Sequence, residues 1–299
     1  MPADEKTLPA GHPPEETASL EAGLDALETR EVVRTPWVRR TFRAVFPPVV
    51  ATALLILVWQ IVFWLDVKPD YVLPSPGMVW DTFADQWSKG NVQEAVLTSV
   101  KRGLLGFALA VVVAIPIGLV VARSRFVRTA IGPLLTGLQT LPSVAWVPAA
   151  IIFFGLNERA MFAVILLGAV PSIANGLVAG VDQTPPLYNR VGHVLGARRL
   201  SMIRHVLLPA AFPGFLAGLK QGWAFSWRSL MAAELIVRSA SLGTGVGQLL
   251  DEGRQLFDMS LVFVAIIGIL IVGIAVELLL FAPLERRMLR NRGLAGAGN

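Results

Sequence analysis

The sequence predicts an all-α integral membrane protein with six transmembrane helices. Of its 299 residues, 54% are hydrophobic and only 16% are charged, whereas soluble domains carry about 25% charged residues. Several apolar stretches are longer than the ~18 residues that identify a membrane-spanning helix. Because a soluble core would show shorter helices with one polar face each, we expect a membrane protein.

The first three apolar segments cover residues 46–66, 99–122 and 130–155. An amphipathic segment lies between the first two, at residues 79–87, and we expect it to lie on the membrane interface. The third segment contains Pro133, Pro142 and Pro148. Because proline disrupts helical hydrogen bonding, we expect this span to be kinked or to follow a short helix.

The last three apolar segments cover residues 161–181, 210–237 and 259–281. Pro171 lies inside the fourth span, and a basic stretch separates the fourth span from the fifth. Between the fifth and sixth spans we expect an external loop, residues 238–258. Its glycine-rich part, Gly243 to Gly247, lacks the spacing of a nucleotide-binding motif and is expected to be flexible.

Arginine residues cluster at alternate ends of these spans, which is typical of cytoplasmic segments. The clusters are Arg34, Arg39, Arg40 and Arg43; Arg123, Arg125 and Arg128; Arg190, Arg198, Arg199 and Arg204; and Arg286, Arg287, Arg290 and Arg292. Lys101 and Arg102, at the start of the second span, are the exception. Six spans satisfy the bias, so we expect a multi-pass protein of the cell membrane with both termini cytoplasmic.

Two polar tails flank the predicted membrane domain, which covers residues 34–290. Residues 1–33 are rich in Pro, Glu and Ala, and they are expected to form a disordered, acidic cytoplasmic tail. Residues 291–299 are expected to be a flexible tail. Since the first apolar run starts about 45 residues into the chain, no signal peptide is expected.

Small residues recur at every fourth position in three spans. They are Gly106, Ala110, Ala114, Gly118 and Ala122; Gly168, Ser172, Gly176 and Gly180; and Gly214, Gly218, Gly222 and Ser226. Such stripes let helix backbones approach closely in lipid, where apolar burial provides no driving force. We expect them to mediate helix packing within or between subunits.

The fifth span carries charged residues that should face protein or water, because a charge at the centre of a spanning helix costs ~2.5–3.5 kcal/mol. Lys220, Trp227 and Glu234 fall within about 40° of one another, nearly opposite the glycine stripe. With Trp223 they are candidates to line or support a solute pathway. Alternatively, Lys220 and Arg228 form structural ion pairs and Glu234 caps the outer end of the helix.

The sequence lacks the usual catalytic and cofactor motifs. It has no G-x-x-x-x-G-K-[ST] phosphate loop, no cysteine, and three histidines without an H-E-x-x-H motif. Ser143 and Ser172 have no base beside them. We therefore expect no catalytic residue, metal or cofactor, and the basic excess at helix ends does not indicate nucleic-acid binding.

Residues 190–209 read as two short helices around a turn. Gly196 would adopt the left-handed conformation that ends the first helix, and Pro209 suits the first turn of the next. An apolar side, Leu195, Leu200, Ile203 and Val206, lies beside a cationic side, Arg198, Arg199 and Arg204. The chemistry alone leaves open whether this segment lies on lipid or docks into a partner.

This stretch resembles the cytoplasmic EAA loop of ABC importer permeases. Gly196 matches the loop's glycine, Leu208 and Pro209 match its end, and Val206 takes the place of isoleucine, whereas Arg190-Val191-Gly192 replaces Glu-Ala-Ala. Other motifs are similar to the sulfonate, taurine and nitrate branch over about residues 45–290. They are Leu73-Pro74-Ser75-Pro76, Leu141-Pro142 with Trp146 and Pro148, Trp227 with Ala232-Ala233-Glu234, and Leu284-Glu285-Arg286-Arg287.

The resemblance implies a type I importer permease with the MetI-like fold and a coupling loop at residues 186–209. Its implied partners are two cytoplasmic ABC ATPase subunits, a second permease copy, an extracytoplasmic solute-binding protein and the lipid bilayer. The implied ATPase-coupling residues are Arg190, Gly196, Ala197, Arg198, Arg199, Leu200, Ile203 and Pro209.

The expected function is import of a small organic anion such as an alkanesulfonate or taurine. The permease would not be an enzyme, since ATP hydrolysis would occur on a separate chain. Within the same class, the solute could instead be nitrate or a thiamine-precursor pyrimidine. In a different class, the chain could be a stand-alone secondary transporter or channel, although Glu234 and Glu277 lie near span ends rather than centrally.

Overall fold

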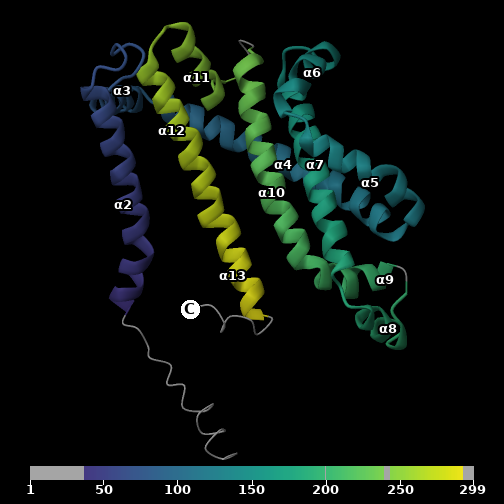
Figure 1. The fold of residues 1–299 in the computed structure, drawn as a ribbon. Coiled ribbons are helices and arrows are strands. Elements are labelled where there is room, and N and C mark those ends of the chain that lie inside the picture. The colour runs from purple at the N-terminus through teal and green to yellow at the C-terminus, as the bar shows by residue number, and fades with distance from the viewer. Residues whose placement is uncertain (1–36, 199, 239–242, 292–299) are drawn as a thin grey trace, which may run out of the picture. The chain divides into compact units, whose positions relative to one another are not determined.

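The computed structural model describes residues 37–198, 200–238 and 243–291, and these residues form helices and short connections without a strand (Figure 1). The two predicted tails and Arg199 lie largely outside the described residues. The chain divides into two units after Val58, within α2. The contacts described below all lie within the unit that begins at Trp59.

The helices follow one another in the order that the apolar pattern predicts. They are α2 (Trp37–Trp64), α3 (Pro76–Ser88), α4 (Asn91–Arg123), α5 (Arg125–Thr140), η1 (Ser143–Trp146), α6 (Val147–Phe154), α7 (Glu158–Asp182), α8 (Pro186–Val194), α9 (Leu200–Met202), η2 (Ile203–Leu207), α10 (Leu208–Ile236), α11 (Val246–Gln255), α12 (Met259–Val276), η3 (Glu277–Phe281) and α13 (Ala282–Asn291).

Five segments among the described residues are long and apolar enough to cross a membrane, which confirms the predicted all-α membrane architecture. They are Val45–Trp64, Asn91–Arg123, Glu158–Asp182, Leu200–Ile236 and Met259–Arg290. The predicted third span is a broken pair, α5 with η1 and α6, bent by 104°. Counted as one span, this pair brings the total to six.

The break in the third span occurs at the Leu141-Pro142 motif. Leu141 has extended backbone angles of φ −75° and ψ 131°. A residue before proline is disfavoured in the helical region, because the proline ring clashes with it. The motif therefore ends α5 and redirects the chain into the 3₁₀ turn η1.

The Leu73-Pro74-Ser75-Pro76 motif starts α3, the predicted amphipathic segment. The Ser75 hydroxyl accepts a hydrogen bond from the Met78 N–H at 3.2 Å, and Pro76 occupies the first turn. Serine caps and first-turn prolines both favour helix initiation. The Pro74 carbonyl accepts a further hydrogen bond from the Trp59 indole at 3.0 Å, which holds the motif against the end of α2.

The core is built around a close contact between α7 and α10. A Cβ at Gly218 would lie 2.6 Å from the Gly176 Cα, and one at Gly214 would lie 2.7 Å from the Gly180 N. A Cβ at Gly222 would meet the side chain of Ile173. The stripe Gly214, Gly218 and Gly222 thus faces α7 of the same chain.

The predicted external loop between the fifth and sixth spans contains a helix, α11, which corrects the sequence-based expectation. Val246 and Leu249 are buried in one cluster with residues of α4 and α12. Gly245 to Gly247 are also buried rather than flexible. Tertiary contacts with two neighbouring helices explain this order, and the local sequence does not reveal them.

Candidate functional site

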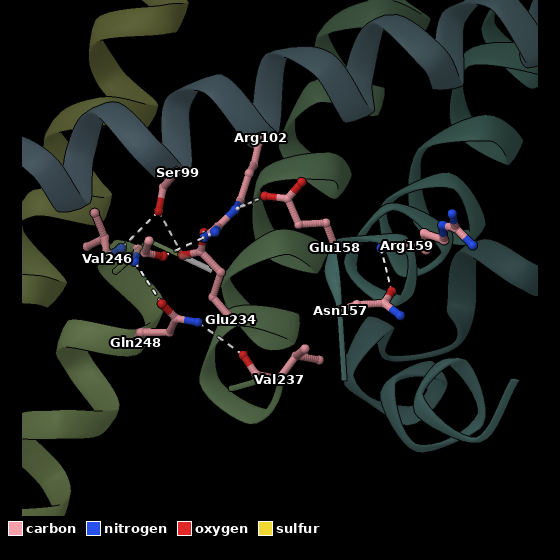
Figure 2. Close-up of polar contacts among 11 residues, drawn as sticks. Ser99, Arg102, Asn157, Glu158, Arg159, Glu234, Val237, Val246 and Gln248 are labelled. Carbon is pink, nitrogen blue, oxygen red and sulfur yellow. Dashed lines mark hydrogen bonds and ion pairs between the residues drawn. The ribbon is translucent and has the colours of Figure 1, made fainter. Parts of the chain in front are cut away.

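The predicted ATPase-coupling residues and Glu234 lie in two regions at opposite ends of α10. One is the segment that the sequence predicts to be a coupling loop, residues 186–209, at the start of α10 (Figure 1). The other is a buried ionic network around Glu234, near its end (Figure 2). With 29 residues at 1.5 Å each, α10 is about 43 Å long, so the regions lie far apart.

Gly196 makes the turn of the coupling loop. Its φ of +80° lies in the left-handed region, which favours glycine. The Gly196 N–H donates to the His193 carbonyl at 3.0 Å, and the Ala197 N–H donates to the Gly192 carbonyl at 2.9 Å. These bonds satisfy carbonyls at the end of α8, so the loop reverses direction in a defined geometry.

The coupling loop closes on a small apolar contact and leaves larger groups exposed. A Cβ at Gly192 would lie 2.9 Å from the Met202 side chain, so α8 approaches α9 closely. Leu195 and Leu200 are 80% and 74% exposed. The same loop also exposes three basic residues, Arg190, Arg198 and Arg204. The loop thus presents a mixed apolar and cationic surface.

The second half of the loop continues into the fifth span without a break. Residues 203–207 form a π-helical turn, and Leu208 begins α10 directly, with Pro209 in its first turn. The sequence predicted two separate short helices before the span. Because helical hydrogen bonding is continuous from Leu200 to Ile236, a force on the loop would act along the whole span.

At the other end of α10, Glu234 is fully buried and paired with Arg102 of α4. The Arg102 Nη1 lies 3.2 Å from the Glu234 Oε1, and the Nε of Arg102 lies 3.2 Å from Glu158 at the start of α7. A third donor, Nη2, bonds the Gly243 carbonyl at 3.1 Å. Arg102 therefore ties α4, α7, α10 and the segment before α11 together.

The remaining groups around Glu234 come from α4 and the start of α11 (Figure 2). The Ser99 hydroxyl donates to the carboxylate at 2.7 Å and accepts from the Val246 N–H at 2.8 Å. The Gly247 N–H donates to Glu234 at 3.0 Å. The positive end of a helix stabilises a carboxylate, and a Cβ at Gly245 would collide with that carboxylate. Only glycine leaves room for Glu234 here.

The four candidate pathway residues are not brought together on one open face. Trp223 and Trp227 are buried and stack with ring centroids 6.0 Å apart. The Trp227 indole donates to the Ile269 carbonyl at 3.2 Å. Lys220 is partly exposed and lies 2.7 Å from Glu277 and 3.1 Å from Glu285, in ion pairs with η3 and α13. Glu234 is enclosed in its own network.

Three members of the Glu234 network escaped the sequence-based prediction: Arg102, Ser99 and Glu158. Arg102 carried a signal, because a charge in an apolar segment must find a partner. In the arginine pattern it stands only as an exception. Ser99 and Glu158 carried no signal beyond their position at the starts of spans.

Comparison with known proteins gives a consistent result. Residues 114–290 match the family described as binding-protein-dependent transport system inner membrane component. The chain is 31% identical to the nitrate import permease protein NrtB of Synechocystis sp., over 78% of this chain and 86% of that protein. It is 30% identical to the putative aliphatic sulfonates transport permease protein SsuC of Bacillus subtilis, over 80% and 85%. The taurine transport system permease protein TauC of Escherichia coli is also 30% identical, over 79% and 86%.

Proposed function

Because the chain belongs to the family of binding-protein-dependent transport system inner membrane components, we propose that two copies of it form the membrane domain of an ATP-driven importer for a small organic anion. The chain is a membrane-embedded permease subunit of an ABC importer and not an enzyme. ATP hydrolysis belongs to a separate ATPase chain, and a solute-binding protein is a further partner. Two points are our proposal beyond the family assignment: that the importer contains two copies of this chain, and that its solute is a small organic anion.

The coupling loop is the observation that carries the proposal. Its exposed leucines, Leu195 and Leu200, suit the apolar groove of a partner, and the surrounding arginines suit an acidic rim. The proposed ATPase-coupling residues are Arg190, Gly196, Ala197, Arg198, Arg199, Leu200, Ile203 and Pro209. Closure of two ATPase subunits would push this loop, and the continuous helix behind it would move the span.

An alkanesulfonate or taurine is the proposed solute, and nitrate or a thiamine-precursor pyrimidine are the alternatives within the class. The names of the sulfonate, taurine and nitrate permeases support an anion. A stand-alone ion-coupled transporter is less favoured, because Glu234 and Glu277 are each engaged by a cation. A carboxylate that couples transport to an ion must instead be free to bind that ion.

In this scheme the candidate pathway residues have different roles. Trp223, Trp227 and Glu234 support the pathway by holding the outer half of α10 against α4 and α12. Lys220, which is partly exposed, is the candidate to face solute. The coupling loop and both termini are cytoplasmic, and the Glu234 end of α10 is external, in agreement with the arginine clusters.

Purification from the native membrane tests the proposal. We expect an ATPase chain to copurify with two permease copies, and ATP-dependent uptake of an alkanesulfonate by the complex reconstituted with its binding protein. Cross-linking or mass measurement of the intact complex would count the copies. Uptake that follows an ion gradient without ATP, by a chain purified without an ATPase, would contradict the proposal.

A further inference from the structure

An open pocket, called the cavity below, has a volume of about 490 Å³ and lies at the end of α10 opposite the coupling loop. It is lined by Val144, Ala232, Leu235, Ile236 and Arg254. Sites for small molecules measure about 300–1,000 Å³ and combine mostly apolar walls with a few polar groups. Its volume falls within this range, its walls are almost wholly apolar, and Arg254 is the one charged residue that lines it.

The turn after the Leu141-Pro142 break contributes Val144 to the wall of this cavity. The turn η1 follows the break and packs against α10, which brings Val144 beside Leu235 and Ile236. A straight third span would carry Val144 past this point instead. The Leu141-Pro142 motif therefore places Val144 at the cavity, which the sequence did not reveal.

The charge at the cavity comes from Arg254, whose partner is the buried carboxylate of Asp251. The Arg254 Nε donates to Asp251 at 2.9 Å, and Arg238 binds the other oxygen of the same carboxylate at 2.6 Å. Two guanidinium groups around one carboxylate leave a net charge of +1. This local excess favours an anion.

Arg254 also has an N–H group that is available to a ligand. Its side chain is 70% exposed, whereas that of Asp251 is 3% exposed. Its bonds to Asp251 use Nε and Nη2, and Nη1 has no hydrogen-bond partner among the described residues. A planar guanidinium held from one side by a buried carboxylate is pre-oriented to bind an oxyanion from the other.

We propose that this cavity is a site where the permease receives a short-chain organic anion, with its acidic head on Arg254 and its apolar chain on Val144, Ala232, Leu235 and Ile236. The proposal rests on the proposed import function and specifies the solute as an amphiphilic anion. Each methylene that enters the apolar part should tighten binding by about fourfold. Nitrate, which has no apolar part, would gain nothing from these walls.

Direct binding is the first test, and it does not depend on transport. The permease is placed in lipid nanodiscs, and binding of methanesulfonate, ethanesulfonate and butanesulfonate is measured by saturation-transfer NMR. We expect binding to tighten along this series and to weaken about tenfold or more in Arg254→Gln, since a charged hydrogen bond is lost. Ala232→Phe, which fills the cavity, should weaken butanesulfonate most.

Arg238→Gln is the matched control, because it removes the same charge from the same carboxylate but does not line the cavity. Because Arg238→Gln lowers the local positive charge but removes no ligand contact, we expect it to weaken binding clearly less than Arg254→Gln does. In each variant Asp251 retains one arginine, so folding should survive, and a thermal unfolding curve checks this.

ATP-driven uptake by the complete reconstituted importer is the second test. Uptake of ethanesulfonate should fall in Arg254→Gln and Ala232→Phe and persist in Arg238→Gln. If the unmodified importer takes up no organic anion, the proposed function fails. If it takes up the anion and the two cavity variants bind and transport like the control, the site is overturned while the function stands.

Discussion

The Arg102 Nη1 lies 3.2 Å from the Glu234 Oε1, although 132 residues separate the two in the sequence. Both side chains are almost fully buried, with exposed fractions of 5% and 0%. Further hydrogen bonds from Ser99 and from the Gly247 N–H complete the site of the carboxylate. A buried ion pair is stable only when its remaining polar groups are also satisfied, as they are here.

Removal of one partner should therefore destabilise the permease strongly. Arg102→Met leaves the Glu234 carboxylate buried without a cation, which costs about 3–5 kcal/mol. The double variant Arg102→Met with Glu234→Met should lose less than the sum of the two single variants. Unfolding of the purified permease in detergent measures these differences.

Lys89→Met provides the matched control for this prediction. It removes an ion pair with Asp85 in which both side chains are about half exposed, and such pairs contribute about 0–1 kcal/mol. If Arg102→Met cost no more than Lys89→Met, the buried pair would not be a stabilising element.

The glycine contact between α7 and α10 should tolerate no added side chain. Gly218→Ala would place a methyl group 2.6 Å from the Gly176 Cα, which forces the backbones apart and costs about 1–3 kcal/mol. Gly273→Ala is the control, since a Cβ there would meet nothing within 4 Å. Thermal unfolding should separate the two variants, and equal stability would show that the helices can move apart freely.

The turn at Gly196 should be needed for partner binding beyond its effect on stability. Gly196→Ala introduces strain of about 1–2 kcal/mol, because φ is positive there. Gly90→Ala is a matched control with φ of +82°, and neither position has an atom within 4 Å of an added Cβ. We expect similar losses of stability from both variants.

Only Gly196→Ala should also weaken ATPase association, because Gly90 lies at the start of α4, outside the coupling loop. Copurification of the ATPase with each variant provides the measurement. Equal retention of the ATPase by both variants would argue against the proposed role of the turn.

Arg190 stands where the EAA pattern that this loop resembles has glutamate, so we expect a compensating acidic residue on the ATPase surface that faces it. Arg190→Glu should then weaken assembly with the native ATPase, measured as the fraction of ATPase that copurifies. A variant that assembled and transported better than the unmodified chain would show that the inversion is incidental.

Lys220 is the candidate pathway residue that remains partly exposed, and its loss should reduce uptake. Lys220→Met leaves Glu277 and Glu285 without the cation that both contact, and two adjacent carboxylates repel each other. Glu285→Gln is the control, because Lys220 keeps Glu277. ATP-driven uptake should fall in the first variant and change little in the second. Unchanged kinetics in a folded Lys220→Met protein would remove Lys220 from the pathway.

Local features of the sequence were enough to predict most of the helices and the turn at Gly196. Apolar length marks a span, proline marks a break, and a glycine between two amphipathic segments marks a left-handed turn, because each effect acts within a few residues. The helix α11 was missed for the opposite reason. Its ten residues are stabilised by packing against α4 and α12. The glycine-rich stretch at its start is typical of a loop, so the sequence did not predict a helix there.

By itself, the sequence determined that this chain is a multi-span membrane protein, since hydrophobic length and arginine clusters are local properties. It also predicted a turn at Gly196, where we propose the coupling loop. Only the tertiary structure decided that Arg102 pairs with Glu234, and that Val144 and Arg254 border one cavity. These residues come from segments far apart in the chain. Their contacts depend on how α4, α7, α10 and α11 pack. A charge in an apolar segment shows that a partner is needed, but it does not show which residue that partner is.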